Sequence, residues 1–202
     1  KKYILAGTCV KNATTLTGRK DGLQVAAIYG MNSFFNVASG FSKVAFQYGM
    51  DSAAGNVGDA QDGNNGKDGD AMYRLTAFGL ASVGESWQIM PAFVYEGKMP
   101  DQGKDTSVLS AVVRPVYKIN DNVAMQFEAG YAMKDNGTDT YGEYKLTVAP
   151  TLKLDTNGFW NRPELRAFVT YVGQDKELGA NISRGSDGET ELRFGTQAEV
   201  WF

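Results

Sequence analysis

The chain has 202 residues and a net charge of −3, so it can form a domain with a sizeable interior but lacks the basic surface of a nucleic-acid binder. It contains no histidine, which excludes serine–histidine catalysis and every histidine metal site. We therefore predict one domain over residues 1–202 that is not an enzyme. We expect no metal site, no cofactor and no nucleic-acid partner.

The sequence has no run of about 18 apolar residues, so it contains no transmembrane helix. Instead, apolar residues recur at every second position, which is the period of a strand and not of a helix. This alternation predicts ten strands, at residues 2–10, 23–31, 42–50, 72–83, 86–97, 107–119, 122–134, 141–154, 162–173 and 189–202.

The segment 122–134 shows the alternation most clearly. Its apolar face consists of Val123, Met125, Phe127, Ala129, Tyr131 and Met133. Its opposite face consists of Ala124, Gln126, Glu128, Gly130, Ala132 and Lys134. An apolar face backed by a charged one is typical of a transmembrane β-strand, although a half-buried strand of a soluble sandwich has the same pattern.

Long polar connections alternate with short ones along the chain. This order puts the long loops at one end of the sheet and the tight turns at the other, as in outer-membrane barrels. We expect the loops near 51–71 and 174–190 to lie outside the cell, and the turns at 84–85 and 120–121 to lie in the periplasm. The acidic loop 51–71 lacks the spacing of an EF-hand, so we interpret it as a solvated loop and not as a calcium site.

Two further features favour a membrane barrel over a soluble sandwich. Several predicted strands have twelve or more residues, which is long for a sandwich, and Tyr and Trp gather near strand ends as in interfacial girdles. Backbone groups in lipid must all be paired, so such a sheet has to close on itself. We predict a closed antiparallel transmembrane β-barrel of about ten strands.

A more specific signal comes from the stretches RPVYKIN, YKLTVAP, FWNRPELRAFVTYVGQDKE and FGTQAEVWF. These stretches resemble the maltoporin family, the sugar-selective trimeric porins of the Gram-negative outer membrane. The similarity runs from about Leu23 to Phe202, is closest after Met72, and corresponds to the second half of an eighteen-stranded family barrel. The chain is then either half of such a barrel or a shortened barrel that closes alone.

Maltoporins carry a row of aromatic side chains through the pore, the aromatic slide, along which sugar rings move. The resemblance assigns three slide positions to Phe41, Trp160 and Trp201. By parity each is in phase with polar residues of its own segment, such as Arg162 and Glu164 for Trp160, so all three should point into the lumen near the tight turns. The alternative is that these rings merely fill the interior of a small barrel.

Seven charged residues face the lumen by the same parity: Arg114, Lys118, Glu128, Lys145, Arg166, Arg193 and Glu199. They are candidates for hydrogen bonds to sugar hydroxyls. They also suit a network of salt bridges that keeps the interior satisfied.

The sequence therefore predicts a passive, sugar-selective diffusion channel in the bacterial outer membrane. Through the resemblance we expect maltodextrins or other oligosaccharides as substrates, outer-membrane lipid around the barrel, and possible roles as a homotrimer and a phage receptor. The alternative is a structural or ligand-binding and phage-binding barrel with a filled, non-conducting lumen.

Overall fold

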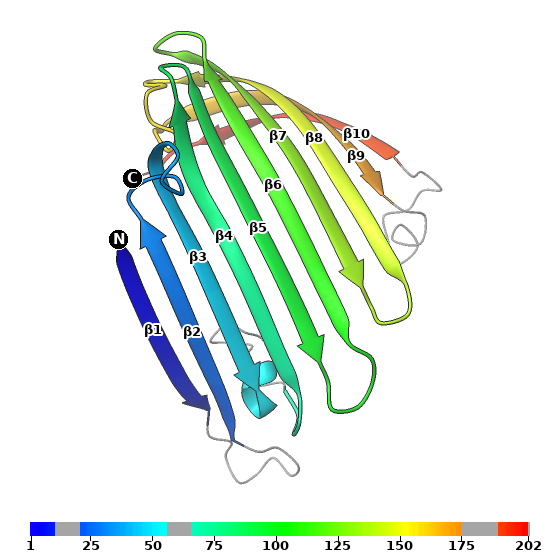
Figure 1. Cartoon of the computed structure of the whole chain (residues 1–202). Helices are drawn as coiled ribbons and strands as arrows, with labels where there is room; N and C mark the ends of the chain where they lie inside the picture. Colours follow the sequence, from blue (N-terminus) through cyan, green and yellow to red (C-terminus); the bar gives the residue numbers. More distant parts are fainter. Residues whose placement is uncertain (11–20, 56–65, 175–189, 202) are drawn as a thin grey trace.

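The protein forms one antiparallel sheet of ten strands in sequence order, β1 to β10. The computed structural model describes residues 1–10, 21–55, 66–174 and 190–201. The loops predicted near 51–71 and 174–190 lie partly or almost wholly outside the described residues. Figure 1 shows the long strands running side by side and the sheet curling, so that β9 and β10 turn behind the others.

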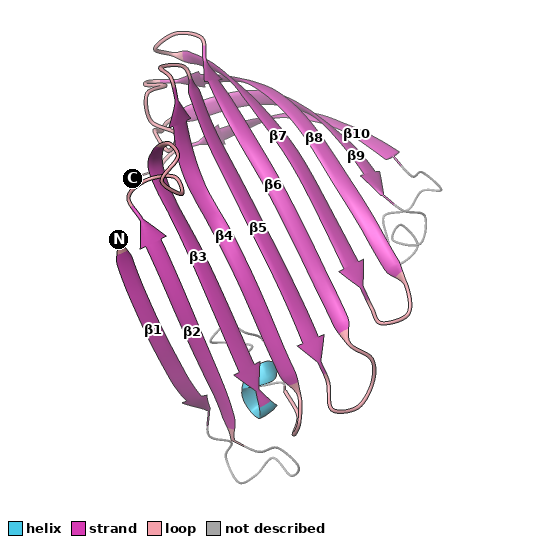
Figure 2. Ribbon diagram, viewed as in Figure 1, coloured by secondary structure: helices cyan, strands magenta, loops and turns pink. Residues whose placement is uncertain are grey.

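All ten predicted strands are present within a few residues of the expected bounds. They are β1 (Lys2–Val10), β2 (Gly22–Met31), β3 (Ser39–Met50), β4 (Ala71–Val83), β5 (Trp87–Met99), β6 (Thr106–Lys118), β7 (Val123–Asp135), β8 (Thr140–Lys153), β9 (Glu164–Gln174) and β10 (Thr190–Glu199). The only helix among the described residues is a short 3₁₀ turn, η1 (Asp51–Ala54), which follows β3 (Figure 2). None of the described residues forms a helix long and apolar enough to cross a membrane.

Strand register carries the two-residue alternation across the whole sheet. On one face Val44 is opposite Ala77, which is opposite Phe93, and most residues of this face are apolar. On the other face Glu128 is opposite Thr147, which is opposite Thr170. Because register keeps side chains of one parity together, the apolar and the polar sets each form a continuous surface.

The polar face is the concave one. The side-chain amide of Gln88, on β5, donates to the Asn157 carbonyl oxygen at 2.8 Å, although Asn157 lies in the connection between β8 and β9. Groups separated by three strands can meet only on the side toward which the sheet curls. We therefore call the polar surface the concave face and the apolar surface the convex face.

Aromatic pairs mark both ends of the convex face. Near the long loops, the rings of Tyr73 and Tyr95 are 5.9 Å apart, and those of Tyr144 and Tyr171 are 6.0 Å apart. Near the tight turns, a second set consists of the pairs Tyr3–Tyr29 and Trp87–Tyr117. Two belts of Tyr and Trp that flank an apolar band are typical of a sheet that crosses a bilayer.

The predicted closure of the barrel is not present. Strand β1 pairs with β2 and β10 pairs with β9, and among the described residues no pairing joins β1 to β10. Both edge strands are therefore open, with Leu5 on β1 and Phe194 on β10 each more than 80% exposed. The chain shows the wall of a barrel without its closure.

The expected alternation of long and short connections is also not strict. The turns at Gly84 and at residues 119–122 are tight, as predicted, and Gly84 takes a positive φ of 60°. However, residues 136–139 form a short connection at the loop end, and residues 154–163 form a ten-residue connection at the turn end. The latter is long because it folds into the concave face.

Candidate functional site

The connection between β8 and β9, residues 154–163, occupies the concave face at the turn end. We call it the inward turn. Its Phe159 is only 6% exposed and packs against Val116 and Ala124, with Leu80 and Met90 around this cluster. These partners come from β4 to β7, so the inward turn reaches across half of the sheet.

Hydrogen bonds fix the inward turn to the neighbouring turn at residues 119–122. The Thr156 hydroxyl donates to the Asn120 carbonyl at 2.6 Å, and the Thr156 amide donates to the Asp121 carbonyl at 3.0 Å. The Lys118 ammonium, on β6, donates to the Asn157 side-chain oxygen at 2.6 Å. The inward turn is thus held by both packing and polar contacts.

A buried ion network forms its base. The Glu164 carboxylate, 2% exposed, lies 3.4 Å from the Lys153 ammonium and 3.2 Å from the Arg162 guanidinium. Lys153 also donates to the Gly158 and Phe159 carbonyls at 3.1 and 2.9 Å. The network therefore ties strands β8 and β9 directly to the backbone of the inward turn.

The same network extends to β10. Register puts Glu164 directly opposite Glu199, and two facing carboxylates repel each other. Arg162 bridges them, because its guanidinium also lies 2.5 Å from Glu199. Arg166 contacts both carboxylates as well, at 3.1 and 3.4 Å, and Gln126 donates to Glu164 at 2.9 Å. Three cations thus neutralise two carboxylates at this end of the concave face.

Two of the three predicted slide aromatics, Trp160 and Trp201, lie beside this network, and Phe41 lies further away on β3. Trp160, 46% exposed, meets the Phe159 ring edge-on at 4.8 Å. Trp201, 63% exposed, lies 5.4 Å from the Arg162 guanidinium in a cation–π contact. Phe41, on β3, meets the Phe78 ring edge-on at 6.2 Å.

These rings are connected indirectly. Phe41 is opposite Leu80 in the register, Leu80 packs on the cluster that contains Phe159, and Phe159 contacts Trp160. The parity argument for Trp160 was wrong in its premise, because β9 begins only at Glu164 and Trp160 lies in the inward turn. The direction of this ring is set by the turn and not by strand alternation.

Further along the concave face, toward the loop end, a second group of charges surrounds Glu128. Its carboxylate accepts from the Arg114 guanidinium, at 2.8 Å from Nε, and pairs with the Lys145 ammonium. The Thr147 and Thr170 hydroxyls, 2.8 Å apart, lie beside it. A polar hollow of about 190 Å³ lies among Arg114, Glu128, Lys145, Thr170 and Gln197.

The structure brings all seven predicted charges into ion pairs. Arg114, Glu128 and Lys145 form one group, Arg166 and Glu199 belong to the buried network, and Lys118 contacts the inward turn and Asp121. Arg193 pairs with Glu191 near the exposed end of β10. Paired ionic groups and hydroxyl groups therefore line the concave face.

Sequence reasoning did not name several residues of this site as candidates, among them Phe78, Lys153, Phe159, Arg162 and Glu164. Lys153 and Glu164 are directly opposite each other in the register, which is visible only once strands are paired. Phe159 was overlooked because the family resemblance assigned a slide position to its neighbour Trp160 and not to Phe159. Phe78 is in phase with Arg74 and Thr76, so parity alone was sufficient to place it on the polar face.

Fold and site together define a porin-type β-sheet, with an apolar face between aromatic belts and a charged, aromatic face on its inside. The chain belongs to the LamB porin family, whose model matches residues 3–202. It is 34% identical over 176 residues to a maltoporin of Photobacterium profundum. That match covers 83% of this chain and 40% of the relative, so the chain spans less than half of that protein's length.

Proposed function

We propose that this chain forms the wall of a passive, sugar-selective diffusion channel in the Gram-negative outer membrane. The observation that carries the proposal is the concave face, where partly exposed aromatic rings stand beside charged and hydroxyl groups. Ring faces stack on the apolar faces of a sugar, and the polar groups exchange hydrogen bonds with its hydroxyls. Such contacts are weak and repeated, which lets a solute both enter and leave.

Maltodextrins are the proposed substrates, because the relative is a maltoporin and the family resemblance assigns three slide positions to Phe41, Trp160 and Trp201. The polar hollow beside Glu128 offers hydroxyl-binding groups along the same face. Trimer formation and phage binding remain proposals that rest on the family resemblance.

We further propose that the sheet is part of a closed barrel in the membrane, as a single domain over residues 1–202. Unpaired backbone groups on β1 and β10 are costly in hydrocarbon, so both edges need partner strands there. Their large exposed side chains, such as Tyr3 and Phe194, suit a lipid-facing position once the edges are paired. We assign the loop end to the cell exterior and the turn end to the periplasm.

A second candidate, a barrel with a filled lumen, is favoured by the inward turn. Phe159 and its partners fill space on the concave face, and the ion network satisfies its charges internally. Such a barrel would bind ligands or phage without conducting.

Sugar binding tests the proposed slide. Trp160→Ala or Trp201→Ala should weaken maltodextrin binding about tenfold, because each removes a ring face worth about 1 kcal/mol or more. Isothermal titration with maltohexaose against the chain in detergent measures this. Trp87→Ala, on the convex face, is the matched control and should leave the affinity unchanged. Equal affinity in all variants would contradict the slide.

A further inference from the structure

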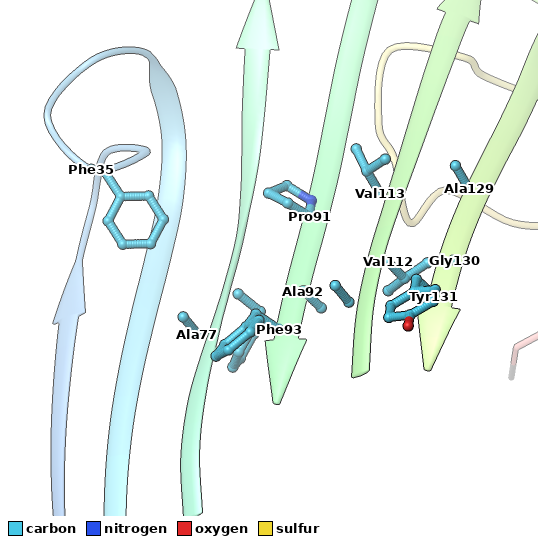
Figure 3. Close-up of a pocket in the computed structure, with 12 residues that line it drawn as sticks. Phe35, Ala77, Pro91, Ala92, Phe93, Val112, Val113, Ala129, Gly130 and Tyr131 are labelled. Carbon is cyan, nitrogen blue, oxygen red and sulfur yellow. The ribbon is translucent and has the colours of Figure 1, made fainter. Parts of the chain in front are cut away.

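The convex face contains an apolar hollow that the channel function does not use. It has a volume of about 480 Å³ and lies on strands β4 to β7, with one wall from the connection between β2 and β3 (Figure 3). We call it the outer hollow. Its outward-facing lining includes Phe35, Ala77, Phe93, Ala111, Ala129 and Tyr131.

The hollow results from the order of large and small residues in the register. One cross-strand row runs from Ala77 through Phe93 and Ala111 to Tyr131. Large rings therefore alternate with methyl groups in this row. Ala129, in the adjacent row opposite Val113, extends the low floor. The rings of Phe93 and Tyr131 therefore border a depression whose bottom is formed by Ala77, Ala111 and Ala129.

A fixed turn supplies the remaining wall. The connection at residues 32–38 folds onto the convex face, where the fully buried Ser42 hydroxyl donates to the Ser33 carbonyl at 2.9 Å and accepts from the Phe35 amide at 3.1 Å. Gly79 leaves room for this fold, because a Cβ there would lie 3.0 Å from the Phe34 ring. Phe35 is thereby held at the turn end of the hollow.

We propose that the outer hollow binds one acyl chain of a phospholipid. This inference rests on the proposed membrane location. The hollow lies between the two aromatic belts, at the depth of hydrocarbon, and its lining is almost entirely apolar. A sugar or a headgroup would lose its hydrogen bonds there, whereas a flexible hydrocarbon chain fills an irregular apolar space without such a loss.

Photo-crosslinking tests the proposal. The full chain is reconstituted in phosphatidylethanolamine vesicles in which a fraction of the lipid carries a diazirine midway along one acyl chain. After irradiation, mass spectrometry should find labels on Phe93, Ala111 and Tyr131 at least fivefold above those around Ala27, an exposed convex-face residue on β2.

Filling the floor should remove this preference. Ala111→Phe and Ala129→Phe, introduced separately so that one misfolded variant does not end the test, should each lower labelling in the hollow at least fivefold. Ala27→Phe is the matched control and should leave it unchanged.

Three outcomes would overturn the proposal. The first is labelling spread evenly over the convex face and unaffected by either floor variant. The second is a cross-link from the hollow to a second copy of the chain, which would identify protein as the occupant. The third is no labelling anywhere, which would remove the chain from the bilayer and contradict the proposed function as well.

Discussion

At the scale of single residues, Glu164 is a central residue of the buried ion network. Its two oxygens receive Lys153, Arg162, Arg166 and Gln126. Two of these cations also hold backbone carbonyls of the inward turn. Loss of the Glu164 charge therefore affects the position of the turn as well as the balance of charge.

Glu164→Gln should lower the free energy of unfolding by about 3–5 kcal/mol, because Lys153 is left as a buried charge without its partner. Urea titration of the chain in detergent, followed by tryptophan fluorescence, measures this. The double variant Glu164→Gln with Lys153→Met removes both charges and should recover most of the loss.

Glu191→Gln is the control for this experiment, since the pair of Glu191 with Arg193 is much more exposed. Exposed pairs contribute about 0–1 kcal/mol, so its effect should be small. Equal losses at Glu164 and Glu191 would mean that the network does not stabilise the turn.

Gly173 has a different role, which is to provide space for a belt tyrosine. It is opposite Tyr144 in the register, and a Cβ at this glycine would come within 2.2 Å of the Tyr144 ring. Gly173→Ala should therefore destabilise the sheet by about 1–3 kcal/mol through overpacking. Gly7→Ala, where the nearest atom is 3.8 Å away, should cause no loss in the same urea titration.

At the scale of elements, strands were predictable from the sequence and the inward turn was not. Alternation is a local property, so each strand, such as Val123–Asp135, could be located from its own residues. The position of residues 154–163 depends on partners from β4 to β7, which are far away in the sequence. Strand parity was extended through Pro163 to Trp160, although the strand begins only afterwards.

Which side chains share the concave face was predictable to the same extent. Register made the parity of Arg114, Glu128 and Lys145 a reliable guide to which side chains share a face. Parity within a strand could not indicate that Lys153 and Glu164 are opposite each other, because neither strand alone contains its pairing partners.

Anchoring of the inward turn can be tested at Phe159. Phe159→Ala should cost about 3–5 kcal/mol, as for other buried aromatic side chains, and should expose Trp160 further. Iodide quenching of tryptophan fluorescence should rise in this variant. Leu154→Ala, in the same turn but 72% exposed, is the matched control and should change neither stability nor quenching. An unchanged quenching profile after Phe159→Ala would show that the cluster does not hold the turn.

At the scale of the whole molecule, the sheet has a convex face suited to lipid and a concave face suited to water. The convex face has belts of Tyr and Trp around an apolar band, and the concave face has paired charges and partly exposed rings. An open sheet cannot hold this arrangement in lipid, which is why we propose that β1 and β10 are paired there. Lumen width grows with strand number, so conduction depends on how that pairing is completed.

Ion current through planar bilayers tests the central claim most directly. We predict that the chain, added from detergent, gives a steady current that maltohexaose interrupts in a concentration-dependent way, and that Trp160→Ala weakens this block about tenfold while the open-channel current persists. A current that maltohexaose never interrupts, or no current at all from correctly folded protein, would contradict the sugar-channel account and favour the filled barrel.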